Sequence, residues 1–522
     1  MSTSSIEINA QFQQAFSLIT ESNKNVLIVG KAGTGKSTFL NYLRTHSKKK
    51  LAILAPTGVA AVNINGVTIH SFCRFSVDVT LNKIRRASAK SNIRKVLAKL
   101  DAIVIDEISM VRADLLDCLD RFLQLNGPHP RRVFGGMQMI FIGDLYQIPP
   151  VVKSDLAKFF STHYASPYFF SARVFTEHGD NFELIEFEKI YRQQEQKFIN
   201  VLNAIRNNTV ANEHLALLNT RLQPEFQPQI DEFWVHITGT NSAVKKINDH
   251  KLALLHHSEK IYPASFSGDI SKESFPADLE LRVKVGAQVM LVNNDEEGRW
   301  VNGTIGQITR IKNTEDLAYD TLYVRLSSGE EVAVMPHTWD VFKYEVDEAT
   351  HTLTTAKIGS FTQYPLRLAW ALTVHKSQGK TFERVIVDLG TTFTPGQMYV
   401  ALSRGTSLEG LVLKKAVTKK NIFIDWRIVK FLTQFQYQKS DKKLSLVDKL
   451  TVIAEAIAKR QLLEIIYLKA QDEKSQRTIQ PSFVGEMTYL GKKFIGVEGI
   501  CQLRGEPRSF RVDRILDIQV KS

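Results

Sequence analysis

Cysteine is scarce in this chain, and long apolar runs are missing from it. The three cysteines in 522 residues, Cys73, Cys118 and Cys501, lie far apart without CxxC or Cys/His spacing. This argues against a disulfide framework, a zinc site and an iron–sulfur cluster. No run approaches the roughly 18 apolar residues that span a bilayer, and the first residues lack the basic and apolar regions of a signal peptide. We therefore expect a soluble cytoplasmic protein that does not bind membranes.

Acidic residues are outnumbered, and the basic excess is concentrated in two stretches. The formal net charge is +13, yet residues 81–100 contain seven Lys and Arg and no acid, and residues 414–449 contain ten basic and three acidic residues. The rest of the chain is close to neutral. Such concentrated charge favours a polyphosphate partner, although two solvated faces of amphipathic helices would produce the same pattern.

A glycine-rich loop follows the apolar run Val26–Val29. It reads GKAGTGKST, which is typical of the turn between a buried strand and a helix that binds a nucleoside triphosphate. Backbone N–H groups point at phosphate oxygens, Lys36 reaches the outer phosphates, and Ser37 offers its hydroxyl to Mg²⁺. The alternative is an ordinary glycine-rich turn. The residues expected to bind the nucleotide here are Gly30, Ala32, Gly33, Thr34, Gly35, Lys36, Ser37 and Thr38.

Two further apolar strands end in polar residues that suit phosphate chemistry. After Ala102–Ile105, Asp106 would hold Mg²⁺ through water, and Glu107 would polarise the water that attacks the terminal phosphate. After the strand MQMIFIG, Gln147 would sense the terminal phosphate, and Pro149-Pro150 would stiffen the segment that follows. A surface acidic pair is the alternative for Asp106 and Glu107.

Seven motifs follow one another along the chain. They are GKAGTGKST, APTGVAAVNINGVTIHSF, DEISM, FGGMQMIFIGDLYQIPPV, IYRQ, LTVHKSQGKTF and YVALSRG. Together they resemble the motifs of superfamily-one helicases, and most closely those of the petite-integration-frequency (PIF) helicase family. The resemblance extends from about Asn9 to Asp425. The segment FGGMQMIFIGDLYQIPP looks like the family's signature stretch, which separates it from RecD-like relatives.

The resemblance implies a catalytic set and two arginine fingers. Arg192 in IYRQ and Arg404 in YVALSRG match the family arginines that reach the nucleotide from the second motor domain. The implied cofactors are ATP and Mg²⁺, and Gly379 joins the nucleotide site. The implied catalytic residues are Lys36, Glu107, Gln147, Arg192 and Arg404.

Adenine recognition is implied by the resemblance alone. The family places a glutamine shortly before the first strand, and this chain offers Gln11, Gln13 and Gln14 without a clear register. We assign the role to Gln14. The alternative is a plain amphipathic helix over Ala10–Ile19 whose glutamines are solvated.

Loops at the carboxyl ends of the strands are expected to contact single-stranded DNA. Lysine suits phosphate, Thr and Ser suit backbone oxygens, and His and Phe suit base stacking. For Phe72 a core position is the stronger alternative. The expected contacts are Pro56, Thr57, Gly58, His70, Phe72, Thr240, Asn241, His375, Lys376 and Ser377.

Strand and helix patterns alternate along the chain with turn residues between them. This alternation predicts an α/β fold with two doubly wound parallel sheets, which the resemblance identifies as RecA-like motor domains. We expect motor domain 1A at 1–180, with a small wedge, 1B, inserted at about 75–99, and motor domain 2A at 181–435. Short β-rich pieces at about 285–361 predict an SH3-like barrel, 2B, inserted in the second motor domain. A polar linker at 436–446 then leads to a small β-rich domain at 447–522.

The last domain resembles WYL domains, although the Trp-Tyr-Leu triplet itself is missing. The resemblance is carried by the string from Ile465 to Ile515, which includes an arginine-rich ending, RSFRVDR. Arg504, Arg508, Arg511 and Arg514 are the expected binding residues, for nucleic acid or another charged ligand. A purely structural appendage is the alternative.

The sequence therefore predicts an ATP-dependent DNA helicase that moves 5′ to 3′ on single strands and unwinds duplex or structured DNA such as G-quadruplexes. Polarity and the preference for DNA come from the resemblance alone, as do roles in DNA replication, repair and telomere maintenance and a nucleoid-associated location. Implied partners are single-stranded and forked DNA, and single-stranded-DNA-binding or replication and repair proteins. We expect a monomer, with dimerisation on DNA left open.

Three other functions remain open from the sequence. One is a DNA-stimulated translocase or RecD-like subunit without independent unwinding. Another is an ATPase that remodels proteins and uses no DNA strand. The third is a DNA-binding regulator in which the WYL-like domain dominates and the motor is vestigial.

Overall fold

The computed structural model describes residues 8–76, 78–152, 156–229, 231–268, 275–313, 319–346, 353–390, 394–470 and 472–521. The chain forms two units. The first contains the residues up to Ile205 together with Val210–Phe423, and the second contains Arg206–Thr209 and Ile424–Ser522. Among the described residues, no helix combines the length and the apolarity needed to cross a bilayer.

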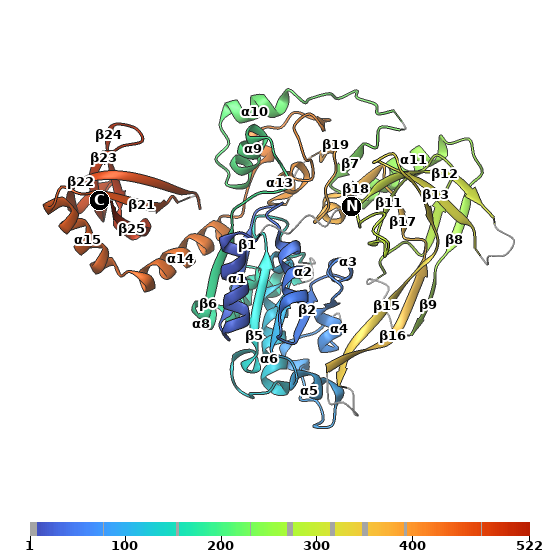
Figure 1. Ribbon diagram of the computed structural model, residues 1–522, viewed down its shortest axis with the longest axis horizontal. Coiled ribbons are helices and arrows are strands. Elements are labelled where there is room, and N and C mark those ends of the chain that lie inside the picture. Colours follow the sequence, from blue (N-terminus) through green and yellow to red (C-terminus); the bar gives the residue numbers. More distant parts are fainter. Residues whose placement is uncertain are drawn as a thin grey trace. The chain divides into compact units, whose positions relative to one another are not determined.

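A six-stranded parallel sheet organises the N-terminal half of the first unit (Figure 1). Its order is β3-β2-β4-β5-β1-β6, and its inner strands are mostly apolar and almost wholly buried, as in a doubly wound sheet. The strands are β1 Asn25–Gly30, β2 Leu51–Ala55, β3 Val67–Thr68, β4 Ala102–Ile105, β5 Gln138–Gly143 and β6 Phe182–Phe187.

The edge strand β6 lies in this first sheet because it pairs in parallel with β1 along its whole length, from Asn25↔Phe182 to Gly30↔Phe187. The boundary expected at residue 180 had placed this strand in the second motor domain. The helices of this half are α1 Ala10–Glu21, α2 Lys36–His46, α3 Gly58–Asn63, α4 Ile69–Cys73, α5 Asn92–Leu97, α6 Ala113–Asn126, α7 Ala157–His163 and α8 Arg173–His178.

The segment expected as the wedge, residues 75–99, contains little regular structure. Its described residues form one 3₁₀ turn, Leu81–Lys83, and the short helix α5. The basic side chains of this stretch are mostly exposed, and Lys83 pairs with Asp78. The positive charge is therefore available to a partner from solvent.

A second, four-stranded parallel sheet follows in the first unit. Its order is β18-β7-β19-β20, and its strands and helices pack into one apolar core. The strands are β7 Val235–Thr238, β18 Ala371–Thr373, β19 Val385–Asp388 and β20 Leu411–Leu413. The helices are α9 Gln196–Arg206, α10 Asn212–Asn219, α11 Asn241–Ala253, α12 Val374–Ser377 and α13 Gln397–Leu402.

A β-rich insertion separates α11 from β18 and begins at Lys260, earlier than expected. Five antiparallel strands in the order β14-β13-β12-β11-β17 enclose their own core, while β15, β16 and β9 form a second sheet and β10 pairs with β8. The strands are β8 Lys260–Pro263, β9 Ser265–Gly268, β10 Glu280–Val283, β11 Gln288–Leu291, β12 Ile305–Lys312, β13 Thr321–Leu326, β14 Glu331–Val334, β15 His337–Val346, β16 Leu353–Gln363 and β17 Leu366–Leu368.

The long strand β15 reaches the first sheet. Tyr344 Oη accepts a hydrogen bond from the backbone N–H of Ile53 at 3.3 Å, and Asn92 of α5 donates to the Tyr344 carbonyl at 2.9 Å. The ring of Tyr344 stands edge-on to Phe72 with the centroids 5.8 Å apart. Phe72 is only 6% exposed, so its side chain is a core residue in this structure and cannot stack on a base.

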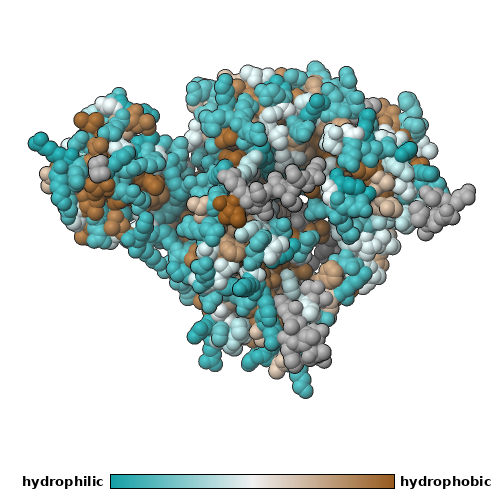
Figure 2. Space-filling view, viewed as in Figure 1, coloured by the Kyte–Doolittle hydropathy of each residue, from teal (hydrophilic) through white to brown (hydrophobic). Residues whose placement is uncertain are grey.

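The second unit is an antiparallel sheet covered by helices. Its order is β24-β23-β22-β21-β25, and α15 packs on it through Ile453 and Ala456. Apolar side chains also remain on its surface (Figure 2), among them Leu490 and Leu503. Its elements are α14 Trp426–Lys443, α15 Leu446–Ala458, β21 Leu462–Leu468, β22 Lys474–Tyr489, β23 Lys492–Cys501, β24 Glu506–Arg511 and β25 Ile515–Lys521.

The segment 436–446, expected as a polar linker, lies mostly in helix α14. Ser440 is buried, and its hydroxyl donates to the backbone carbonyl of Leu516 at 2.8 Å. Lys449 is only 2% exposed, and its Nζ donates to Ser440 Oγ at 2.9 Å. Ser440 is thus a tertiary contact of the second unit, whereas Asp441, Lys442 and Lys443 stay exposed.

Candidate active site

The glycine loop lies between β1 and α2 and curls as the phosphate-binding pattern requires. Gly33 and Gly35 have φ of +81°, a left-handed conformation that favours glycine. A Cβ on Gly33 would lie 2.5 Å from the Cβ of Arg192, so the loop also needs glycine for space. Helix α2 begins directly after the loop, at Lys36, and the first N–H groups of a helix have no intrahelical partner and suit an anion.

Lys36 is half-buried, and backbone carbonyls hold its ammonium group. Its Nζ donates to the carbonyls of Gly30 and Lys31, each at 2.8 Å. Burial lowers the pKa of Lys36, and nearby carboxylates, Asp144 foremost, oppose that shift. A partly desolvated ammonium held by carbonyls is stabilised by an incoming anion. The loop therefore fits a triphosphate.

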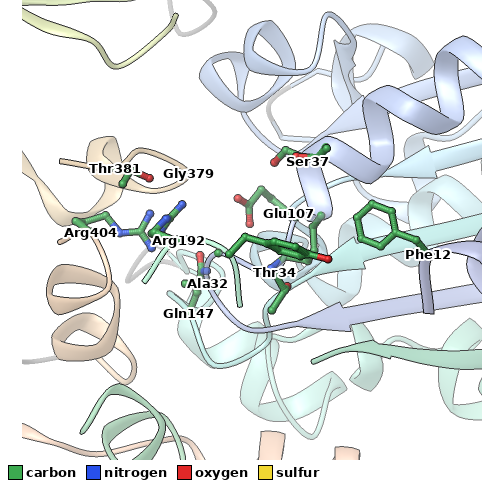
Figure 3. Close-up of a pocket in the computed structure, with 15 residues that line it drawn as sticks. Phe12, Ala32, Thr34, Ser37, Glu107, Gln147, Arg192, Gly379, Thr381 and Arg404 are labelled. Atoms are coloured by element: carbon green, nitrogen blue, oxygen red, sulfur yellow. The ribbon is translucent and has the colours of Figure 1, made fainter. Parts of the chain in front are cut away.

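A cavity of about 620 Å³ opens beside this loop (Figure 3). Phe12 lies on one side, and Gly379, Thr381 and Arg404 approach from the opposite side. Of the residues predicted to bind or act on ATP, this cavity is lined by Ala32, Gly33, Thr34, Gly35, Lys36, Ser37, Thr38, Glu107, Gln147, Arg192, Gly379 and Arg404.

Asp106 and Glu107 follow strand β4, and Glu107 lines this cavity, whereas Asp106 does not. Glu107 has φ +50° and ψ +45°, a left-handed conformation that costs a residue with a Cβ roughly 1–2 kcal/mol. Burial, and secondly the neighbouring Asp106, raise the pKa of Glu107 to about 7. Burial also raises the pKa of Asp106. The oxygens of Ser37 and Asp106 are of the hard type that Mg²⁺ prefers, so this pair fits that ion.

The two arginines lie across the cavity from α2 (Figure 3). Arg404 follows α13 and is completely buried, and burial followed by the charge of Arg192 lowers its pKa to about 9. Its guanidinium donates to the carbonyls of Val400 at 2.8 Å and Lys380 at 3.1 Å. Arg192 follows β6 and donates to the carbonyl of Ser403 at 3.0 Å. Backbone carbonyls therefore position the guanidinium groups of both arginines.

Asp144 and Tyr399 were not among the predicted site residues, although each lies inside a quoted motif. Tyr399 Oη donates to Asp144 Oδ2 at 3.2 Å and accepts a hydrogen bond from the N–H of Ala32 at 2.9 Å. Asp144 is completely buried and also accepts from Gln147 Nε2 at 3.3 Å. The structure thus connects the second sheet to two motifs of the first.

Gln14 does not belong to the cavity. Helix α1 turns Phe12 and Ala15 inward, and Gln14, about 200° around the helix axis from Phe12, is exposed. The assignment of Gln14 to adenine recognition is therefore wrong for this conformation. Gln11 is held by Glu188, whose backbone N–H donates to Gln11 Oε1 at 3.1 Å.

Comparisons with known proteins agree with this geometry. Residues 6–215 match the family model for PIF1-like helicases, and residues 448–520 match the WYL domain. A relative from Bdellovibrio bacteriovorus named ATP-dependent DNA helicase Pif1 is 31% identical over 443 residues, which cover 83% of this chain and 93% of the relative. The chain belongs to the PIF1-like helicase family.

Solved Pif1 structures resemble this chain in fold as well as in sequence. Bacteroides sp. Pif1 in complex with ADP-AlF4 is 37% identical with a TM-score of 0.74, over 83% of this chain and 97% of that one. A second structure, which describes unwinding of forked double-stranded DNA by two coordinating Pif1 helicases, is 36% identical with a TM-score of 0.60, over 82% and 97% of the two chains.

The strand-contact loops expected from the Pif1 resemblance lie at helix starts that follow parallel strands. Thr57 caps α3 by accepting from the Ala60 N–H at 3.2 Å, and Thr240 caps α11 by accepting from the Ala243 N–H at 3.2 Å. A capping hydroxyl still has its own hydrogen to donate. Thr240 and Asn241 are exposed, whereas Pro56, Thr57, Gly58 and His70 are half-buried.

The third of these Pif1 loops holds one residue that does not point outward. His375 is exposed and Lys376 half-buried, but Ser377 is completely buried and its hydroxyl donates to the Val374 carbonyl at 2.8 Å. Ser377 was predicted to contact DNA, and that prediction is wrong for its side chain. Consecutive residues of a helix are rotated by about 100° about its axis, so His375, Lys376 and Ser377 on α12 point in different directions.

The arginine row of the WYL domain divides into two kinds. Arg504 and Arg508 are exposed. Arg511 pairs with Asp513, with Nη2–Oδ2 at 2.6 Å, and its guanidinium stands 5.4 Å from the ring centre of Phe494. Arg511 and Arg514 are half-buried. Arg504 and Arg508 are thus the more accessible cations.

Proposed function

We propose that this protein is an ATP-dependent DNA helicase that moves along single-stranded DNA. One observation carries the proposal: the phosphate loop of the first sheet and Arg404 behind the second sheet line the same cavity. A nucleotide bound there contacts both halves, so its binding and hydrolysis change their separation.

The nucleotide chemistry follows from the side chains around the cavity. Lys36 and the loop N–H groups bind the phosphates of ATP, and Ser37 and Asp106 would hold Mg²⁺, which would supply charge neutralisation at the phosphates. Glu107 accepts a proton from the attacking water, and Gln147 lies beside the terminal phosphate. Arg192 and Arg404 stabilise the charge that develops in the transition state.

The strand binds at the starts of α3, α4, α11 and α12. Exposed or half-buried residues at these helix starts offer amide, hydroxyl, imidazole and ammonium groups, which suit a sugar–phosphate backbone and stacked bases. They are Pro56, Thr57, Gly58, His70, Thr240, Asn241, His375 and Lys376. The polarity, 5′ to 3′, and activity on forks and G-quadruplexes are proposed from the family resemblance.

The WYL domain is proposed as an accessory binding module for nucleic acid. The exposure of Arg504 and Arg508 supports this, because solvent-facing guanidinium groups are free to approach phosphates. The unit that begins at Ile424 supports placing the domain boundary there, with α14 as part of the module. We also propose that two copies act together on forked DNA, by analogy with the two coordinating Pif1 helicases of the related forked-DNA structure.

The decisive experiment is unwinding of partial duplexes that carry either a 5′ or a 3′ single-stranded tail, with ATP. Lys36→Ala serves as the inactive control, and Arg504→Ala with Arg508→Ala tests the accessory module without truncating α14. We expect unwinding of the 5′-tailed duplex only, and weaker activity in the double variant.

Other outcomes select the other functions. Unwinding of the 3′-tailed duplex only would show that the protein moves 3′ to 5′, opposite to the proposed polarity. Failure on both duplexes, with ATP hydrolysis still stimulated by DNA, would indicate a translocase or RecD-like subunit. ATP hydrolysis that is indifferent to single-stranded DNA would indicate a protein-remodelling ATPase.

A further inference from the structure

Gln378 connects the second sheet to the residues expected to position the attacking water. It follows α12, and its Nε2 donates to Gln147 Oε1 at 2.9 Å and to Glu107 Oε2 at 3.3 Å. Glu107 lies at the end of β4, and Gln147 lies beyond β5. One amide from the second sheet therefore contacts both residues of the first.

The orientation of both amides follows from the carboxylates around them. Glu107 offers acceptors to Gln378, so Gln378 presents its Nε2 on that side. Gln147 directs its own Nε2 to Asp144 Oδ2 and so presents Oε1 to Gln378. The chain Asp144, Gln147, Gln378, Glu107 is therefore consistent in every donor and acceptor.

This arrangement leaves one polar atom unsatisfied. Among the described residues, Gln378 Oε1 is buried without a hydrogen-bond partner. A buried acceptor without a partner costs free energy, and such groups are retained where they have a role in a site. The position of Gln378 is thus not explained by packing alone.

The backbone around Gln378 is held by Arg404. Its Nη1 donates to the carbonyl of Ser377 at 3.3 Å and to that of Lys380 at 3.1 Å. These two carbonyls flank Gln378 and Gly379, so the guanidinium grips both ends of the turn 377–380. The turn that carries Gln378 is thus held by an arginine that also lines the nucleotide cavity.

The same turn is continuous with the proposed strand contacts. His375 and Lys376 precede Gln378 by three and two residues, on the one-turn helix α12. A DNA strand that displaces His375 and Lys376 would also displace Gln378, because only two or three residues separate them. The movement is transmitted to the amide that contacts Glu107 and Gln147.

We infer that Gln378 is a positioning residue that couples strand binding to hydrolysis by placing Glu107 and Gln147 for attack on ATP. The inference rests on the proposed function, because it assigns the coupling between the two proposed sites. It acts through Glu107 and Gln147, and it requires no contact of Gln378 with the nucleotide.

The test uses the full-length chain with ATP and a single-stranded oligodeoxythymidine. The kcat, the KM for ATP and the oligonucleotide Kd are measured for the wild type and for Gln378→Ala. We expect Gln378→Ala to lower the DNA-saturated kcat about tenfold, as loss of an outer hydrogen-bond partner of a catalytic group does. The KM for ATP and the Kd for the oligonucleotide should change less than about twofold, because Gln378 is not proposed to contact either ligand in the ground state. The ratio of DNA-stimulated to DNA-free turnover should fall.

Two further variants separate positioning from damage to the interface. Gln193→Ala removes amide hydrogen bonds to the carbonyls of Ser403 and Gly405 in the second half without touching Glu107. It should keep the stimulation ratio. In a double-mutant cycle, Gln378→Ala added to Gln147→Ala should lower kcat less than the two single effects combined, because the pair shares one hydrogen bond.

The inference is overturned by an unchanged stimulation ratio in Gln378→Ala, by a rise in KM that accounts for the whole loss, or by the same fall in Gln193→Ala. Additive effects in the cycle would also overturn it. If the wild-type chain shows no stimulation by the oligonucleotide, the proposed function fails instead, and the two failures are distinguished in one assay.

Discussion

Tyr399 and Asp144 connect the two halves of the first unit, since Tyr399 Oη on α13 donates at 3.2 Å to Asp144 Oδ2, which follows β5. The same hydroxyl accepts from the phosphate loop at Ala32. One phenol therefore bridges the loop that binds the nucleotide, the segment that carries Gln147 and the helix that precedes Arg404. The two halves are bridged in this way by residues that also surround the site of hydrolysis.

Tyr399→Phe should destabilise the first unit by about 1–3 kcal/mol, because a buried carboxylate and a buried N–H each lose a hydrogen-bond partner. Thermal or urea unfolding measures this directly. Tyr42→Phe on α2, outside the cavity, is the control for loss of a hydroxyl. Equal stability of Tyr399→Phe and wild type would show that the bridge contributes nothing to folding.

Glu107→Gln should bind ATP and single-stranded DNA but hydrolyse ATP at least about 10²-fold more slowly, because an amide cannot accept the proton of the attacking water. Glutamine has the same length and meets the same left-handed backbone, so the fold is retained. Binding of a fluorescent ATP analogue tests the retained affinity, and steady-state turnover tests the slower hydrolysis. Turnover at the wild-type rate would remove Glu107 from the role of general base.

Gly396→Ala should weaken packing between the second half and the loop that carries Gln147. Gly396 has φ +78°, and a Cβ there would lie 2.5 Å from the carbonyl oxygen of Tyr146. Backbone strain alone costs roughly 1–2 kcal/mol, and the clash adds to it.

Gly298→Ala is the matched control for this substitution, because Gly298 has φ +75° and nothing within 4 Å of the added carbon. The difference in unfolding free energy between the two variants isolates the clash. If Gly396→Ala loses no more stability than Gly298→Ala, the loop is not clamped by Gly396. Turnover in Gly396→Ala should fall together with stability.

Lys376→Ala should weaken single-stranded DNA binding uniformly across sequences and reduce the slope of log Kd against log salt by about one, as removal of one phosphate contact does. Fluorescence anisotropy at several salt concentrations measures this slope. An unchanged slope would mean that Lys376 contacts no phosphate.

Ser377→Ala, at the neighbouring position, should leave DNA affinity nearly intact. The hydroxyl is buried and satisfied within α12, so its removal should reduce stability by about 1 kcal/mol. A loss of DNA affinity as large as that of Lys376→Ala would restore Ser377 as a strand contact.

Much of the site was predictable because local chemistry determines it. The glycine loop, Asp106-Glu107 and the strand before Gln147 combine short apolar runs with residue types that few other functions require, and these signals lie within a few residues of one another. The parallel sheets followed from the same alternation. The loop residues Ala32–Thr38 line one cavity with Glu107 and Gln147, and with Arg192 and Arg404, which the family resemblance implied.

Directions of side chains were less predictable. Gln14 and Ser377 lie in segments that were identified, but they point away from the expected partner because the phase of a helix is set by packing and not by motif identity. Residues 436–446 resemble a linker in composition, yet Gln436 and Ser440 are buried, and Ser440 donates to the carbonyl of Leu516 in β25. Polar residues give no signal of burial when their partners are distant in sequence.

The sequence by itself indicated a nucleoside triphosphate site, a helicase and a WYL-like domain, because each motif is a short run of neighbouring residues and the order of seven such runs along the chain is visible without the fold. Only the tertiary structure decided that Gln378 contacts Glu107 and that Tyr399 contacts Asp144, pairs separated by 271 and 255 positions. No local pattern encodes such contacts, since they arise only after two separately folded sheets bring their ends together.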